Sequence, residues 1–184
     1  MKSIPYGVSR FEDVRNDNSY YVDKTMYLPE LEYTGKYLFL IRPRRFGKSL
    51  FVSMMRAYYD LSYADRFDRL FAGLWIHEHP TSLKNSFQVI YLDFSLVGGR
   101  DEAELEANFE NYCSTALDTF GQRYARYYAP DFPGQLRSNT TARAKFNFIH
   151  EQATLRSYPL YLIIDEYDNF TNVILSDRGK DMFR

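Results

Sequence analysis

The feature that most constrains the fold is a short apolar run followed by a glycine-containing loop and a helical pattern. Tyr37–Ile41 is nearly continuous in apolar residues and rich in aromatic and β-branched side chains, which is typical of a strand buried on both faces. After the loop Arg42–Gly47, the stretch Ser49–Leu61 places apolar residues at helical spacing, namely Phe51, Met54, Met55 and Tyr58. The region therefore predicts a strand–loop–helix unit whose strand is the first core strand of the fold.

The loop of this unit has the spacing of a phosphate-binding loop. The Walker A pattern is Gly, four residues, Gly, Lys and then Ser or Thr, and the string Arg42-Pro43-Arg44-Arg45-Phe46-Gly47-Lys48-Ser49 fills every position except the first. In that pattern Gly47 lets the backbone approach phosphate, Lys48 reaches the β- and γ-phosphates, and the Ser49 hydroxyl binds Mg²⁺. We expect the nucleotide to be bound by Arg44, Arg45, Phe46, Gly47, Lys48, Ser49 and Leu50.

Two other interpretations of the loop remain open at this point. The tripeptide Gly47-Lys48-Ser49 also occurs in ordinary turns, although a preceding strand and a following helix favour the phosphate-binding interpretation. Arg42, Arg44 and Arg45 carry permanent charges that repel one another unless an anion or carboxylates lie nearby. A local nucleic-acid patch is the second choice, because the net charge of −1 provides no basic surface around it.

A second motif follows the most apolar run of the chain. Leu160–Ile164 predicts a buried strand, and it is followed directly by Asp165 and Glu166, which is the Walker B arrangement. We expect Asp165 to hold Mg²⁺ opposite Ser49, and Glu166 to act as the general base that orients the attacking water. Acidic residues also form turns after buried strands, so the interpretation depends on the two motifs occurring together.

Other polar residues are weaker candidates. Asp93 lies near the end of another predicted strand, at the same sheet edge, and could assist Mg²⁺, although packing or capping is the simpler role. Asp168 is expected to be a surface or cap residue. His77 and His79 flank Glu78 with no cysteine nearby, a pattern that rarely binds metal.

The rest of the chain alternates predicted strands and helices. We expect a second strand over Gln88–Phe94 and a lead-in segment over residues 1–35. The apolar spacing predicts helices over Lys24–Tyr33, Asp65–Leu74, Asp101–Tyr128 and around Ala142–Ala153. Alternation of this kind indicates an α/β fold with a parallel sheet flanked by helices.

Composition places the chain among ordinary globular proteins. Its 184 residues suit one domain, and its single cysteine, Cys113, lies in a helical pattern, which favours a buried thiol over a disulfide. Aromatic content is high, with 17 Tyr and 15 Phe, and a core rich in aromatic rings explains this more simply than base stacking. No stretch approaches the roughly 20 apolar residues that cross a bilayer, so we expect no membrane span and a cytoplasmic location.

The same residues resemble the bacterial AAA-ATPase-like family. The resemblance rests on Ile4–Gly7, Tyr21–Thr25, the string from Tyr37 to Leu50, Leu92–Ser95 and Ile164–Asp168, and it covers essentially the whole chain. In that family the first Walker glycine is usually missing, as it is here. The resemblance implies a P-loop NTPase fold of the additional-strand ATPase type, and often a PD-(D/E)xK nuclease-like domain downstream.

The resemblance also implies that this chain is an N-terminal part of that fold. The sensor strand, which lies between the two motif strands in such proteins, and any arginine finger would follow Arg184. We therefore expect this chain alone to bind and hydrolyse nucleotide weakly or not at all, and the intact protein to be a Mg²⁺-dependent ATPase. A nucleotide-binding scaffold or switch without significant hydrolysis is the alternative. The oligomeric state, a nucleic-acid partner and the preference for ATP over GTP stay open.

Overall fold

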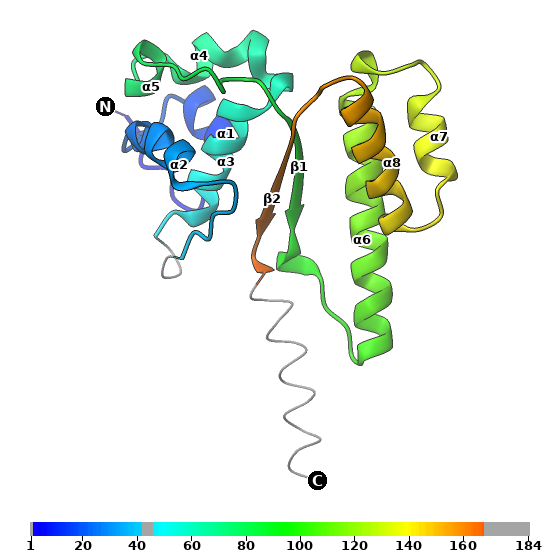
Figure 1. Ribbon diagram of the computed structural model, residues 1–184. Coiled ribbons are helices and arrows are strands. Elements are labelled where there is room, and N and C mark those ends of the chain that lie inside the picture. Colours follow the sequence, from blue (N-terminus) through cyan, green and yellow to red (C-terminus); the bar gives the residue numbers. More distant parts are fainter. Residues whose placement is uncertain (1, 42–45, 168–184) are drawn as a thin grey trace. The chain divides into compact units, whose positions relative to one another are not determined.

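The computed structural model describes residues 2–41 and 46–167, and the chain divides into two compact units, Met1–Phe87 and Gln88–Arg184 (Figure 1). The first unit contains α1 (Phe11–Asn16), the 3-10 helix η1 (Thr25–Tyr27), α2 (Leu28–Thr34), α3 (Lys48–Tyr59), the 3-10 helix η2 (Leu61–Arg66), α4 (Phe67–Phe71) and α5 (Trp75–Glu78). The second contains β1 (Gln88–Asp93), η3 (Phe94–Leu96), α6 (Glu102–Arg123), η4 (Ala125–Tyr127), α7 (Phe132–Ser138), α8 (Ala142–Leu155) and β2 (Leu160–Asp165).

The second unit is an α/β arrangement around two parallel strands. β1 pairs with β2 so that Gln88 lies opposite Leu160 and Asp93 lies opposite Asp165. Both strands were predicted from their apolar runs, and the parallel pairing confirms the α/β prediction at this level. Because facing residues in a parallel ladder point to the same side of the sheet, the carboxyl ends of both strands place Asp93 and Asp165 side by side.

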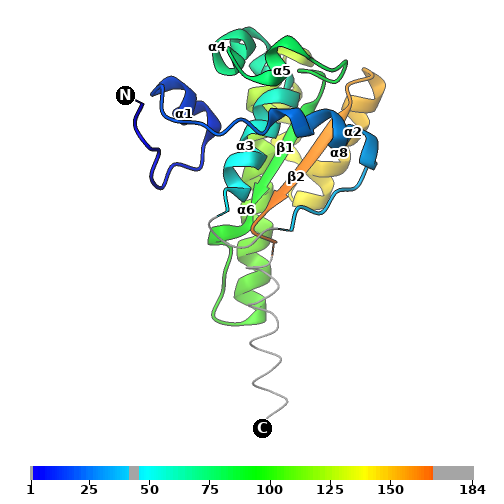
Figure 2. The same ribbon diagram turned by 90° about the vertical axis from the view of Figure 1, so that its left-hand side faces the viewer.

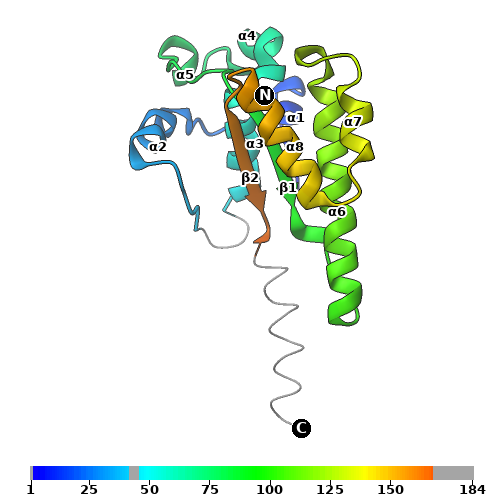
Figure 3. The same cartoon turned by 45° about the vertical axis from the view of Figure 1, so that its right-hand side comes forward.

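Three helices form the core of this unit together with the strands. Figure 3 shows α6, α7 and α8 packed side by side, and their buried side chains form one apolar cluster with β1. Its members are Ile90, Phe94, Val97, Leu105, Cys113, Leu117, Phe120, Tyr124, Tyr128, Phe132, Leu136, Ala142 and Ile149. The burial of Cys113 confirms the prediction for the thiol.

Two details of this unit differ from the prediction. The α-helix expected to reach Tyr128 ends at Arg123, and Tyr128 instead stacks on Phe132 with ring centroids 3.9 Å apart. The turn-rich segment around Pro133 contains helix α7, which the sequence did not predict. Proline is accepted there because it lies in the first turn, where its missing N–H has no intrahelical partner.

Aromatic rings from helices α1, α3 and α4 form the centre of the first unit. Figure 2 labels these three helices. The ring of Phe11 lies 5.0 Å from that of Phe71, and the ring of Tyr58 lies 5.8 Å from Phe71 and 6.1 Å from Phe67. Tyr58, Phe11 and Phe71 are fully buried. In both units the unusual aromatic content therefore serves the core.

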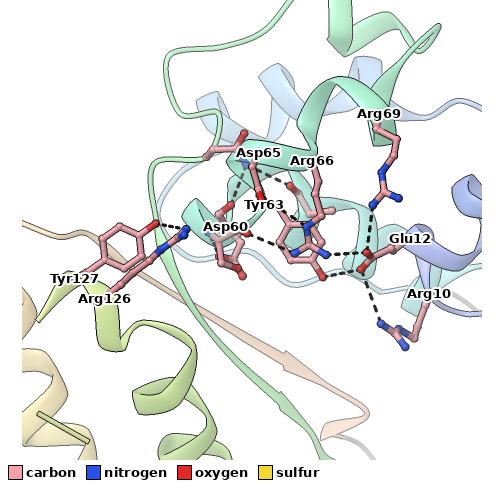
Figure 4. Close-up of polar contacts among 12 residues, drawn as sticks. Arg10, Glu12, Asp60, Tyr63, Asp65, Arg66, Arg69, Arg126 and Tyr127 are labelled. Atoms are coloured by element: carbon pink, nitrogen blue, oxygen red, sulfur yellow. Dashed lines mark hydrogen bonds and ion pairs between the residues drawn. The ribbon is translucent and has the colours of Figure 1, made fainter. Parts of the chain in front are cut away.

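Polar contacts tie the lead-in segment to the rest of the first unit. In Figure 4 the guanidinium groups of three arginines point toward Glu12 of α1, and Arg66 donates to it at 2.8 Å, whereas Arg10 and Arg69 stay 3.9 and 3.8 Å away. Further along the chain, a carboxylate oxygen of Glu32 accepts a hydrogen bond from Thr81 at 2.7 Å. Residues 1–35 are thus integrated into the unit.

The motif Tyr21–Thr25 caps helix α5 from a distance. Asp23 Oδ2 accepts the Trp75 backbone N–H at 2.7 Å, and Thr25 Oγ1 accepts that of Ile76 at 3.1 Å. Asp23 Oδ1 also accepts the Thr25 backbone N–H at 2.8 Å. The contact to α5, a helix that the sequence did not predict, depends on the fold.

The strand predicted over Tyr37–Ile41 is not a strand in the structure. The segment belongs to no ladder, and within the described residues the sheet consists of β1 and β2 alone. The side chains of Tyr37, Phe39 and Ile41 are 91%, 82% and 83% exposed. The apolar pattern indicates that these residues favour burial, but a strand also needs a neighbouring strand to pair with, and the described part of the chain supplies none.

Candidate functional site

The predicted phosphate-binding residues lie at the start of helix α3. Gly47 is the N-cap residue, with φ 75° and ψ 27°, a left-handed conformation that glycine adopts at little cost. A Cβ at this position would meet no atom within 4 Å, so backbone conformation and not space favours glycine here. Phe51 N–H donates to the Gly47 carbonyl at 3.0 Å, which is the first intrahelical hydrogen bond.

The first turn of α3 suits an anion. Gly47 has no side chain to accept hydrogen bonds from the helix amides, whereas Asp101 and Thr141 supply such acceptors at the starts of α6 and α8. Lys48 occupies the first helical position, where the helix dipole disfavours a cation, and this turn carries no acidic residue. The positive charge of Lys48 therefore adds to the partial positive charge of the N–H groups at this helix end.

Three of the other residues predicted to contact the nucleotide lie in the described part of the chain. The Phe46 side chain is 64% exposed, and Ser49 and Leu50 continue the first turn of the helix, partly buried. Arg44 and Arg45, together with Arg42, lie outside the described residues. Their role as phosphate ligands stays a prediction.

The predicted metal and base residues lie at the carboxyl end of β2. Asp165 is 3% exposed, and its Oδ1 accepts the Glu166 backbone N–H at 3.0 Å. The Tyr91 hydroxyl donates to Asp165 Oδ2 at 3.5 Å, so both carboxylate oxygens have a hydrogen-bond donor nearby. A buried carboxylate needs such donors, because removing its charge from water is costly.

Glu166 has an unusual backbone. Its φ of 53° lies in the left-handed region, which longer side chains rarely adopt outside special sites. Strained residues of this kind gather at functional sites, where the surrounding structure holds them in place. The carboxyl end of β2 thus combines a buried carboxylate with a strained acidic residue directly after it.

Asp93 lies opposite Asp165 in the register, as the sequence predicted for the sheet edge. Its Oδ1 accepts the Ser95 N–H at 2.9 Å, which caps the 3-10 helix η3, and the simple capping role is thereby confirmed. The Asp93 N–H donates to the Tyr112 hydroxyl at 2.7 Å, and burial raises the pKa of that phenol. Tyr112 therefore anchors the end of β1 to α6 as a neutral group.

Each of the two units contains one half of the candidate site. Lys48 and Ser49 belong to the first unit, and Asp165 and Glu166 belong to the second. Their convergence on one nucleotide stays a prediction from the sequence. Asp168 lies outside the described residues.

His77 and His79 contact neighbouring side chains. His77 Nε2 lies 3.1 Å from Asp68 Oδ1, and the ring of His79 stacks on Trp75 with centroids 4.4 Å apart. Among residues 2–41 and 46–167, no group of at least three His, Cys, Asp or Glu side chains is arranged to hold a metal ion.

Sequence reasoning missed the tyrosines at the strand ends. Tyr91 and Tyr112 contact Asp165 and Asp93, respectively. One signal was available for Tyr91, because strand alternation places it on the same face as Asp93, two residues away. No local pattern indicated Tyr112, whose contact depends on how α6 packs against β1.

No helix in the described part of the chain is sufficiently long and apolar to span a membrane.

Comparison with known proteins identifies the family. A family model described as "Predicted AAA-ATPase" matches residues 5–184. An uncharacterized protein encoded in the vnfD 5' region of Azotobacter chroococcum mcd 1 is 30% identical over 171 residues, which make up 91% of this chain and 29% of that protein. The chain thus spans less than a third of the length of this curated relative. No solved structure matches the chain. Because the family model covers nearly the whole sequence, the chain belongs to the AAA-ATPase-like family.

Proposed function

We propose that this chain carries the nucleotide-binding motifs of a Mg²⁺-dependent ATPase, and that the intact protein hydrolyses ATP. The observation that supports this most directly is the start of α3, where a left-handed glycine precedes Lys48 and Ser49 in the first helical turn. Backbone N–H groups at a helix start, a helix dipole and a lysine at one point are the elements of a phosphate site. Membership of a family described as predicted AAA-ATPases agrees with nucleotide binding at this coarse level.

In this proposal the α3 end binds the triphosphate. The backbone N–H groups of residues 46–50 surround the phosphate oxygens, and Lys48 neutralises charge on the β- and γ-phosphates. Arg44 and Arg45 add positive charge that a polyanion would compensate. The residues expected to contact the nucleotide are thus those predicted from the loop.

Ser49 and Asp165 are the residues that would hold Mg²⁺. They offer a hydroxyl and a carboxylate oxygen, which are the hard ligands this ion prefers, and the buried Asp165 charge gains a counter-ion. When bound, the ion would neutralise charge on the β- and γ-phosphate oxygens. Glu166 would hold a water in line with the γ-phosphorus and accept its proton as the new P–O bond forms and the bond to ADP breaks.

The finer fold we propose is the additional-strand P-loop type. Leu162 and Ile164 of β2 are 47% and 44% exposed, and Tyr37–Ile41 is an exposed apolar segment directly before the phosphate-binding loop. In a fold of this type, further strands would pair with such segments and cover them. This arrangement explains why two apolar segments remain exposed in this chain.

The energy of hydrolysis would be used elsewhere in the protein. We propose coupling to a downstream module, of the nuclease-like type that the family resemblance implies. The alternative is a scaffold that binds nucleotide without turnover. The two differ in whether Glu166 acts as a base.

The test uses the complete protein. ATP and GTP are titrated with and without Mg²⁺, and phosphate release is measured for wild type, Lys48→Ala and Glu166→Gln. We expect Lys48→Ala to abolish binding, and Glu166→Gln to bind ATP but lose about 100-fold or more of the turnover, because general-base catalysis contributes roughly 10²–10⁴-fold. Wild-type binding without turnover would assign the scaffold function. Unchanged phosphate release in Glu166→Gln would overturn the catalytic role of this residue.

A further inference from the structure

The side chain of Tyr91 lies on the same face of the sheet as the predicted metal ligand. Tyr91 is opposite Ile163 and Asp93 is opposite Asp165, so Tyr91 is the diagonal neighbour of Asp165 across the parallel pair. Because side chains alternate along each strand, these residues share one face. A tyrosine is long enough to bring its hydroxyl to the carboxylate at the strand end.

The Tyr91 hydroxyl contacts the Asp165 carboxylate oxygen that the Glu166 backbone N–H does not contact. Asp165 Oδ1 accepts the Glu166 N–H at 3.0 Å, and Tyr91 donates to Oδ2 at 3.5 Å. With a donor on each oxygen, the carboxylate plane has a preferred rotation about the Cβ–Cγ bond.

We propose that Tyr91 is a positioning residue that orients the Asp165 carboxylate for Mg²⁺. The inference rests on the proposed function, because it assigns Tyr91 a role toward the ion that Asp165 would hold. Groups that hydrogen-bond to metal-ligating carboxylates fix the ligand orientation and raise metal affinity. Tyr91 acts through Asp165 and does not itself touch nucleotide.

A purely structural role makes a different prediction. If Tyr91 only satisfied a buried carboxylate, its loss would lower stability and leave the Mg²⁺ dependence of nucleotide binding unchanged. If it orients Asp165, its loss weakens Mg²⁺ binding specifically. The separating measurement is therefore nucleotide affinity as a function of Mg²⁺ concentration.

The experiment compares Tyr91→Phe with Tyr127→Phe in the complete protein. Tyr127 is a matched control, because it is also a partly buried tyrosine, and its hydroxyl accepts a hydrogen bond from the Arg126 guanidinium at 2.8 Å. Its ring lies 5.8 Å from Tyr158, which precedes the amino end of β2, so it belongs to the opposite edge of the sheet. Binding of the β,γ-imido analogue of ATP is measured by calorimetry across a Mg²⁺ series.

We expect Tyr91→Phe to raise the half-saturating Mg²⁺ concentration about 3- to 10-fold, below the roughly 10–100-fold typical of such partners because the 3.5 Å contact is long. Metal-free nucleotide binding should match wild type, and the unfolding temperature should fall slightly because Asp165 loses a donor. Tyr127→Phe should leave the Mg²⁺ response and metal-free binding unchanged. In an Asp165→Asn background, Tyr91→Phe should have no further effect on Mg²⁺, as a double-mutant cycle requires for coupled residues.

The outcomes separate the two proposals. An unchanged Mg²⁺ dependence in Tyr91→Phe, or an equal loss in the Asp165→Asn background, overturns the positioning role and leaves the proposed function intact. Wild-type protein whose nucleotide binding does not respond to Mg²⁺ overturns both.

Discussion

The backbone of Glu166 allows stability and catalysis to be separated by substitution at one position. Its φ of 53° places a non-glycine residue in the left-handed region directly after β2. Glycine adopts this conformation without a clash between Cβ and the backbone, whereas alanine keeps the clash. Neither variant has a carboxylate, so the difference between Glu166→Gly and Glu166→Ala isolates the backbone term.

The magnitude follows from two opposing effects. The left-handed conformation costs a non-glycine residue about 1–2 kcal/mol. Glycine loses more chain entropy on folding, which offsets about 0.5–1 kcal/mol of that gain. The hydrogen bond from the residue 166 N–H to Asp165 Oδ1 survives in both variants because its donor is backbone. We therefore expect Glu166→Gly to be about 0.5–1 kcal/mol more stable than Glu166→Ala.

Urea denaturation measures the free energy of unfolding, and phosphate release by the complete protein measures the chemistry. Both variants should lose roughly 10²–10⁴-fold in turnover, the usual contribution of a general base. Ser157 is the control, because it also has a positive φ, of 57°, in the turn after α8. Ser157→Gly should exceed Ser157→Ala in stability by a similar amount and leave turnover unchanged.

Two results would refute the reasoning. If Glu166→Gly were no more stable than Glu166→Ala, the left-handed backbone would not be a source of strain. If either Glu166 variant hydrolysed ATP at the wild-type rate, the strain would be unrelated to catalysis by this side chain.

Three further predictions concern the fold. Asp23→Ala removes a hydrogen-bond acceptor at the start of α5 and should lower the free energy of unfolding by about 1–2 kcal/mol. Thermal unfolding followed by the fluorescence of Trp75, the single tryptophan, measures this. An unchanged midpoint would contradict the capping role of Asp23. Burial raises the pKa of Cys113 from 9.0 to about 11. Native protein at pH 8 should therefore react slowly with thiol reagents, and fast labelling would exclude a buried thiol. The stability that the protonated thiol contributes should be lost as pH rises from 9 toward 11. Backbone amides of residues 37–41 should exchange with solvent rapidly in this chain and slowly in the complete protein, and equally rapid exchange in both would count against the additional-strand fold.

The sequence predicted elements where one local pattern was sufficient. Leu160–Asp165 and Gln88–Asp93 are strands because both runs are apolar and rich in β-branched or aromatic residues. The same rule failed for Tyr37–Ile41, because hydrophobicity indicates a tendency to be buried but does not supply the neighbouring strand. Helix α7 was not predicted, because its proline and glycine weaken the helical signal, although proline is accepted in a first helical turn.

The candidate site was predictable to the extent that it depends on topology. Parallel strands end at one edge, so Asp93 and Asp165 were expected to be neighbours, and the register places them opposite each other. The Tyr91 contact required knowledge of that register. The positive φ of Glu166 could not be read from sequence, because a glutamate there carries no signal comparable to glycine.

Local departures from favourable structure occur in both halves of the proposed site. Lys48 lies where the α3 dipole disfavours a cation, Asp165 is a buried carboxylate, and Glu166 has a strained backbone. Such exceptions to local consistency are expected mainly at functional sites. Lys48 and Asp165 carry opposite charges. Under the proposed function, a magnesium–nucleotide complex would bring an anion to the first motif and a cation to the second, which lie more than 110 positions apart in the sequence.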